Sequence, residues 1–134
     1  MSFKIELDHI GIATPGIQDD NFFSLLGLFD GGQEEVPSEK VKVGFYGTEN
    51  KANIELLEPL SKESPIAKFL EKRGPGIHHI CFRVQGIDEL VQNLKAKGVR
   101  FINEEPRPGA HNCRVVFIHP KSAGGVLVEL SEKA

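Results

Sequence analysis

The size and charge of the chain set the first limits on its function. It has 134 residues, of which 40% are hydrophobic and 26% are charged, as is usual for one ordinary globular domain. The 16 Lys and Arg residues and 19 Asp and Glu residues give a net charge of −3, which argues against nucleic-acid binding as the main function. A chain of this length buries enough apolar surface to fold without disulfides or a metal.

The cysteines and the N-terminal segment predict a reducing, cytoplasmic environment. Cys81 and Cys113 flank apolar runs, so we expect buried free thiols rather than a disulfide. The first eight residues carry charges where a signal peptide needs an unbroken apolar stretch. Nor does any later stretch approach the roughly 20 apolar residues of a membrane span. We therefore expect a cytoplasmic protein with no membrane partner.

Short runs rich in β-branched and aromatic residues predict strands over residues 5–13, 41–46, 53–57, 77–84, 100–102, 114–118 and 126–130. Apolar residues at helical spacing predict helices over residues 18–26, 64–73 and 88–97. Ser64 followed by Pro65 is typical of a helix start. Gly27, Gly74 and Gly98 are well placed to end the three helices.

These elements occur in the same order twice, once in residues 4–60 and again in residues 76–131, with a short helical segment between. A further strand near residues 28–32 would complete the match. His9 stands in the first strand of the first repeat, and His79 holds the same place in the second. Each repeat also ends on an acid within an apolar strand, Glu55 and Glu129, which lie 46 and 50 positions after their histidines.

A carboxylate in an apolar strand needs a cation if it is buried, because removing an unpaired charge from water is costly. If the repeats pack about a pseudo-twofold axis, His9, Glu55, His79 and Glu129 form a set of two nitrogens and two oxygens that suits Zn, Co, Ni or Mn. Each residue alone is explained as well by a structural role, but equivalent placement in two repeats favours a metal site. The register selects His79 over His78, since neighbours on a strand face opposite ways.

Several stretches carry a family resemblance: the His motifs of both repeats, Leu-Glu-Pro-Leu at residues 57–60, Pro-Gly-Ala-His at residues 108–111 and His-Pro-Lys-Ser at residues 119–122. With them the chain resembles the vicinal oxygen chelate superfamily and, within it, the methylmalonyl-CoA epimerase family. The resemblance implies a glyoxalase-like α+β fold. Two tandem βαβββ modules would pair into a curved, cleft-forming mixed sheet, making one domain over residues 1–134.

The resemblance also implies an isomerase that interconverts (2R)- and (2S)-methylmalonyl-CoA by α-proton abstraction through a metal-stabilised enolate. The implied divalent metal, Co, Zn, Ni or Mn, would be held by His9, Glu55, His79 and Glu129. Glu129 is the first candidate for the base, and Glu55 is its possible partner on the opposite face. Some family members carry a catalytic Glu on the strand at residues 41–46, but this chain has Val43 or Gly44 there, and Glu39 is a weaker alternative. The family also tends to form homodimers.

Three basic residues in predicted loops that contain Pro and Gly are candidates for binding the anionic acyl-CoA: Arg107, His111 and Lys121. Solvated surface charges explain Arg107 and Lys121 equally well, and His119 is explained equally well as a turn residue. Two other functions share the implied fold: glyoxalase I (lactoylglutathione lyase), and a non-catalytic ligand-binding protein of the bleomycin-resistance type. The full set of metal ligands favours an enzyme.

Overall fold

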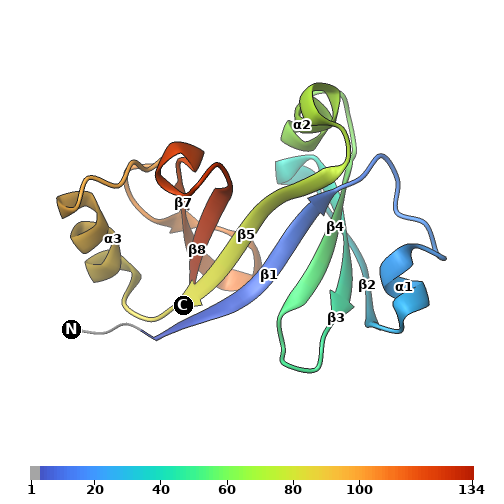
Figure 1. Ribbon diagram of the computed structural model, residues 1–134, viewed down its shortest axis with the longest axis horizontal. Coiled ribbons are helices and arrows are strands. Elements are labelled where there is room, and N and C mark those ends of the chain that lie inside the picture. Colours follow the sequence, from blue (N-terminus) through green and yellow to red (C-terminus); the bar gives the residue numbers. More distant parts are fainter. Residues whose placement is uncertain (1–3) are drawn as a thin grey trace. The chain divides into compact units, whose positions relative to one another are not determined.

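The computed structural model describes residues 4–134, with the side chain of Ala110 left out (Figure 1). The first three residues lie outside the described residues. They belong to the N-terminal segment whose charges argue against a signal peptide. The chain divides into two compact units: one is His9–His78, and the other is His79–Ala134 with the residues up to Asp8. Within the described part of the chain, no helix is long and apolar enough to cross a membrane.

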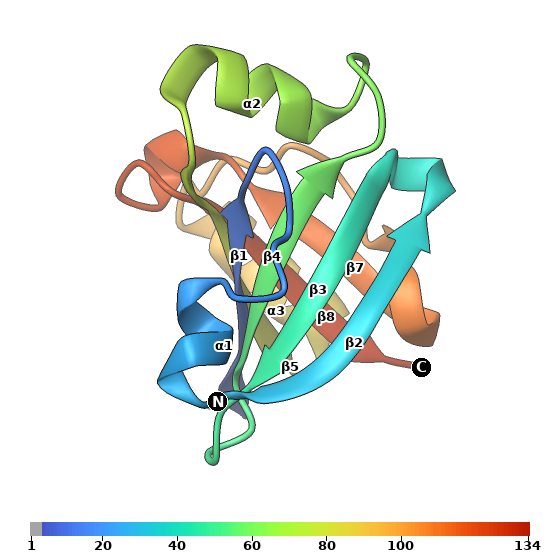
Figure 2. The same cartoon turned by 90° about the vertical axis from the view of Figure 1, so that its right-hand side faces the viewer.

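The first unit is a βαβββ module whose strands lie in the order β2-β3-β4-β1. Strands β1 and β4 pair in parallel, and the other neighbours are antiparallel. Helix α2 follows the module, and Figure 2 shows it beyond the end of β4. The elements are β1 (Ile5–Ala13), α1 (Phe22–Leu26), β2 (Phe29–Val36), the 3-10 turn η1 (Pro37–Glu39), β3 (Val41–Gly47), β4 (Asn53–Pro59) and α2 (Pro65–Arg73).

The second unit repeats this arrangement, with strand order β5-β8-β7-β6 and a parallel pairing of β5 with β8. The strand predicted near residues 28–32 is present as β2, so each half is a βαβββ module, and the predicted α+β class is confirmed. The elements are β5 (Gly76–Val84), α3 (Ile87–Ala96), β6 (Arg107–Pro108), the 3-10 turn η2 (Ala110–Asn112), β7 (Cys113–Ile118), the 3-10 turn η3 (Pro120–Ser122) and β8 (Leu127–Lys133).

In the second unit, helix α3 covers one face of the sheet. Its buried residues Ile87 and Val91 pack with Val116, which is fully buried on β7, and with Leu130 on β8. Because side chains alternate along a strand, Phe117 and Glu129 point to the opposite face. The cysteines are both free, with Cys81 buried and Cys113 half-buried, as the sequence predicts for Cys81.

Two local predictions are wrong because a polar side chain replaces a backbone partner. Residues 100–102 form no strand but a single bridge, Phe101 to Ile118, since the side chain of Asn103 accepts the hydrogen bond from the Phe117 N–H at 2.8 Å. Helix α1 begins at Phe22 rather than at residue 18. Its N-cap is Asn21, whose side-chain oxygen accepts hydrogen bonds from two N–H groups of the first turn.

A third correction concerns Arg107, which the sequence places in a loop. It lies in β6, a strand of two residues paired with Val115 and Arg114 of β7. Pro108 has no N–H to donate, so a strand here is confined to the edge of a sheet and kept short.

The start of α2 agrees with the prediction and can be tested. The side chain of Ser64 is fully buried and accepts a hydrogen bond from the Ile66 N–H at 3.1 Å. We expect Ser64→Ala to lower the free energy of unfolding by about 1 kcal/mol, because it removes the N-cap. Urea unfolding measures this, with the exposed Ser61→Ala as control; equal losses in the two variants would contradict the capping role.

The first turn of α3 carries a pH-dependent contact. The Arg114 guanidinium donates two hydrogen bonds of 2.8 Å to Asp88, and they hold the pKa of Asp88 below its usual 3.8. A carboxyl with a lower pKa in the folded chain adds stability above its unfolded pKa, and this is lost as the pH falls through the folded pKa.

We therefore expect Asp88→Asn to lower the melting temperature at pH 7, with a difference from wild type that shrinks as the pH falls below about 4. Thermal unfolding across this range is the measurement. Glu89→Gln removes the same charge from the same helical turn and is the control. A gap that stays constant down to pH 2 would contradict the assignment.

Candidate functional site

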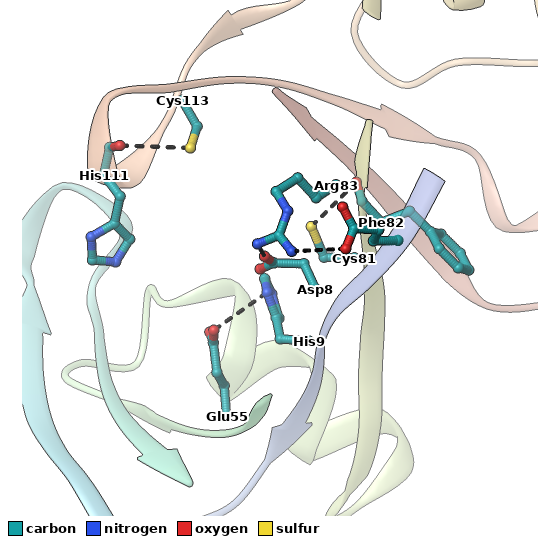
Figure 3. Close-up of polar contacts among 9 residues, drawn as sticks. Asp8, His9, Glu55, Cys81, Phe82, Arg83, His111 and Cys113 are labelled. Carbon is teal, nitrogen blue, oxygen red and sulfur yellow. Dashed lines mark hydrogen bonds and ion pairs between the residues drawn. The ribbon is translucent and has the colours of Figure 1, made fainter. Parts of the chain in front are cut away.

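The first unit brings His9 and Glu55 together on one face of its sheet. Glu55 on β4 is paired with Gly11 on β1, and His9 lies two residues before Gly11, so its side chain points to the same face. The His9 Nδ1 atom lies 3.3 Å from Glu55 Oε2, and the two side chains are 12% and 15% exposed (Figure 3). The structure thus joins two residues that the sequence places 46 positions apart.

The second unit contains the same arrangement. Glu129 on β8 is paired with Cys81 on β5, and His79 lies two residues before Cys81. The His79 Nε2 atom lies 3.5 Å from Glu129 Oε1, with side chains 11% and 16% exposed. The register is the same in the two halves, and the distance and burial are similar, although His9 uses Nδ1 and His79 uses Nε2. A coincidental contact is therefore an unsatisfactory explanation for either pair.

His79 rather than His78 lies against a carboxylate, as strand alternation predicts. The His78 ring instead packs edge-on against Phe69 of α2, with 5.1 Å between the ring centres. Burial in these surroundings lowers the pKa of His78, so the ring is more often neutral than an exposed histidine.

A phenylalanine stands beside each carboxylate, which the sequence analysis missed. Phe45 on β3 is paired with Glu55, and Phe117 on β7 is paired with Glu129. Both phenylalanines are half-buried. The only signal in the sequence was that each Phe precedes its Glu by a similar distance, ten and twelve positions.

A second glutamate in each half holds the segment that follows the first strand. Glu58 and Glu132 each lie three residues after the site carboxylate, and so on the other face of the strand. Glu58 accepts a hydrogen bond of 2.7 Å from the Ile17 N–H, and Glu132 accepts from the N–H groups of Gly86 and Ile87. These contacts tie the end of the first strand of each module to its last strand.

The candidates for substrate binding and the alternative base Glu39 lie on β6 and on the three 3-10 turns. The Arg107 guanidinium lies 5.8 Å from the centre of the Phe117 ring. His111 is exposed in η2 with left-handed backbone (φ 57°). Lys121 is exposed in η3, where its N–H donates to His119 Nδ1 at 3.0 Å, so His119 has the structural role of a turn residue. Glu39 is exposed in η1.

The donor chemistry of the two pairs fits a divalent cation. Each pair offers one imidazole nitrogen and one carboxylate oxygen. These two atoms lie 3.3 Å apart in the first pair and 3.5 Å apart in the second, close enough for both to bind the same ion. Imidazole and carboxylate together suit Zn, Co, Ni and Mn, which all accept mixed nitrogen and oxygen ligands. The same carboxylates are also placed to accept a proton.

Comparison with known proteins agrees with this arrangement. Residues 8–117 match the model of the glyoxalase/bleomycin resistance protein/dioxygenase superfamily. The chain is 45% identical over 133 residues to the mitochondrial methylmalonyl-CoA epimerase of Dictyostelium discoideum, covering 96% of this chain and 78% of the relative.

Solved structures give the same result. The methylmalonyl-CoA epimerase of Mycobacterium tuberculosis superposes with a TM-score of 0.84 at 40% identity, over 96% of this chain and 87% of that one. A methylmalonyl-CoA epimerase in complex with methylmalonyl-CoA and NH4+ has a TM-score of 0.81 at 33% identity, over 96% of this chain and 94% of that one. The predicted glyoxalase-like fold is confirmed by this similarity.

Proposed function

The chain belongs to the glyoxalase/bleomycin resistance protein/dioxygenase superfamily, and from this premise we propose that it epimerises methylmalonyl-CoA at its α-carbon. Its relatives of 40–45% identity over most of the chain support an isomerase of the epimerase class. The observation that carries the proposal is the pair of His–Glu contacts in identical register, because an epimerase needs one proton acceptor and one proton donor.

In this proposal the two carboxylates move the proton. The α-proton of a thioester is weakly acidic, and Glu129, half-buried beside His79, is the group assigned to remove it. Glu55 is the equivalent carboxylate of the other half and is assigned to return a proton to the opposite face. Phe45 and Phe117 are the strand partners of these two carboxylates.

The four residues His9, Glu55, His79 and Glu129 are also the proposed ligands of one divalent metal. A cation held there would stabilise the negative charge that develops on the thioester oxygen as the proton leaves. We also propose that Arg107, His111 and Lys121 bind the anionic acyl-CoA. The protein is further proposed to be a single domain that forms a homodimer in the cytoplasm. Sedimentation of the pure protein tests the homodimer.

Exchange of the substrate α-proton tests the proposed function directly. The metal-loaded protein is incubated in heavy water with (2R)-methylmalonyl-CoA, and mass spectrometry follows deuterium at the α-carbon while chiral analysis follows inversion. We expect both to proceed. No exchange above background would overturn the proposal, and turnover of the hemithioacetal of methylglyoxal and glutathione instead would assign the glyoxalase reaction.

A further inference from the structure

The two halves match around their His–Glu pairs, but they differ in charge at one position of the edge strand. Val115 on β7 lies two residues before Phe117, and Val43 on β3 lies two residues before Phe45, so these valines are equivalent. Val115 is paired with Arg107 of β6, whereas Val43 is paired with Glu34 of β2. The same place in the two modules therefore carries a cation in one and a carboxylate in the other.

Arg107 belongs to the sheet face that carries Glu129. Paired residues share a face, and residues two apart on a strand do so as well, which places Arg107, Phe117 and Glu129 together. The guanidinium lies 5.8 Å from the Phe117 ring centre, within the range of a cation–π contact. The ring next to the proposed base thus also holds the cation in place.

The charge of Arg107 is available to a ligand. Two other arginines of this unit are already engaged by carboxylates: Arg83 contacts Asp8 at 3.0 Å, and Arg114 contacts Asp88 at 2.8 Å. For residues 4–134, the structure gives Arg107 the Phe117 ring as its contact and no carboxylate. Its side chain is exposed, so an anion can reach the guanidinium without displacing a protein group.

We propose that Arg107 orients the acyl-CoA by binding an anionic oxygen group of the substrate beside the His79–Glu129 pair. Glu34 repels such a group at the equivalent place beside the His9–Glu55 pair. The two modules are nearly equivalent around their His–Glu pairs, so the charge difference selects the second module for the anionic group. Phe117 is a positioning residue that acts through Arg107. This inference rests on the proposed function and adds which module holds the anionic group of the substrate.

Kinetic constants of Arg107→Met with methylmalonyl-CoA are the central test. We expect KM to rise at least about tenfold, the size of one lost charge-assisted hydrogen bond, while kcat stays within about threefold. Arg107→Lys should recover part of the loss, because it keeps the charge without the planar stacking group. Calorimetry with malonyl-CoA gives a second readout, a weaker Kd, that does not depend on turnover.

A matched control and a double variant separate binding from folding. Arg114→Met removes an arginine from the neighbouring strand whose side chain faces α3, and it should leave KM unchanged. Phe117→Leu should raise KM in the wild-type background but add nothing to Arg107→Met, because its effect passes through Arg107.

The anionic group can be the malonyl carboxylate or a CoA phosphate, and a shortened substrate distinguishes them. If methylmalonyl-pantetheine, which has no phosphate, shows the same penalty in Arg107→Met, the carboxylate is the partner; if the penalty disappears, it is a phosphate. Unchanged KM and Kd in Arg107→Met, with an active wild type, would overturn the inference and leave the proposed function standing. An inactive wild type would overturn both.

Discussion

Glu129→Gln is expected to lower the rates of α-proton exchange and of inversion by about 10²–10⁴-fold, because an amide cannot take up the proton that a carboxylate removes. The other acid of β8, Glu132, lies three residues further on, faces the other side of the strand and is bonded to the N–H groups of Gly86 and Ile87, so it does not replace Glu129. Deuterium incorporation and chiral analysis of the product are measured separately, since one base is enough for exchange and two are needed for inversion.

Glu55→Gln is the matched control for this substitution. If Glu55 is the opposite-face partner, exchange of one epimer persists while inversion fails. The metal content of both variants is measured at the same time, so that a lost ion is not mistaken for a lost base. Glu129→Gln with both rates within tenfold of wild type would contradict the assignment. Loss of inversion in Glu39→Gln but not in Glu55→Gln would identify Glu39 as the second base.

Removal of either histidine is expected to abolish stoichiometric metal binding. We expect one divalent ion per chain in the wild type, and in His9→Ala and His79→Ala a loss of affinity greater than the roughly 10–100-fold that follows changes around metal ligands. Because an ion that binds only the folded chain stabilises it, the melting temperature should also rise on metal addition in the wild type and not in these variants.

His78→Gln is the control, because it changes the adjacent histidine on the same strand, whose ring packs on Phe69. Metal analysis after dialysis decides between three results. If the wild type binds one ion per chain and each histidine variant loses it, the four ligands form a shared site. Two ions per chain, each lost with one histidine, would show that the pairs bind separately. Wild-type metal content in both variants would remove the metal site from the proposal.

Much of the fold was predictable because its signals are local. Strand β1 has the predicted bounds, and α2 begins at Pro65 after its N-cap Ser64 and ends before Gly74, as these capping residues indicate. The failures occur where a side chain a few residues away takes the place of a backbone partner. Asn103 does so after residue 102, and Asn21 does so before α1, and neither effect shows in hydrophobic periodicity.

The candidate site was also predictable only where its signals are visible in the sequence. An acid and a histidine at matching places in two repeats are visible in the sequence, so the two His–Glu pairs could be predicted. The stacking of Arg107 on Phe117 could not, because it depends on the register between β6 and β7, and a strand of two residues leaves no periodic signal. The reversal of charge between Glu34 and Arg107 becomes visible only when that register is known.

The parallel pairing of β1 with β4 and of β5 with β8 also bears on how the molecule folds. Parallel neighbours need a long crossover connection, and the partners in each His–Glu pair are 46 and 50 residues apart. Contacts this distant in sequence form late, because the entropy of closing the loop is lost before they contribute. A folding intermediate with native helices and antiparallel hairpins would thus lack both pairs, and acquisition of the site would report the last step of folding in each half.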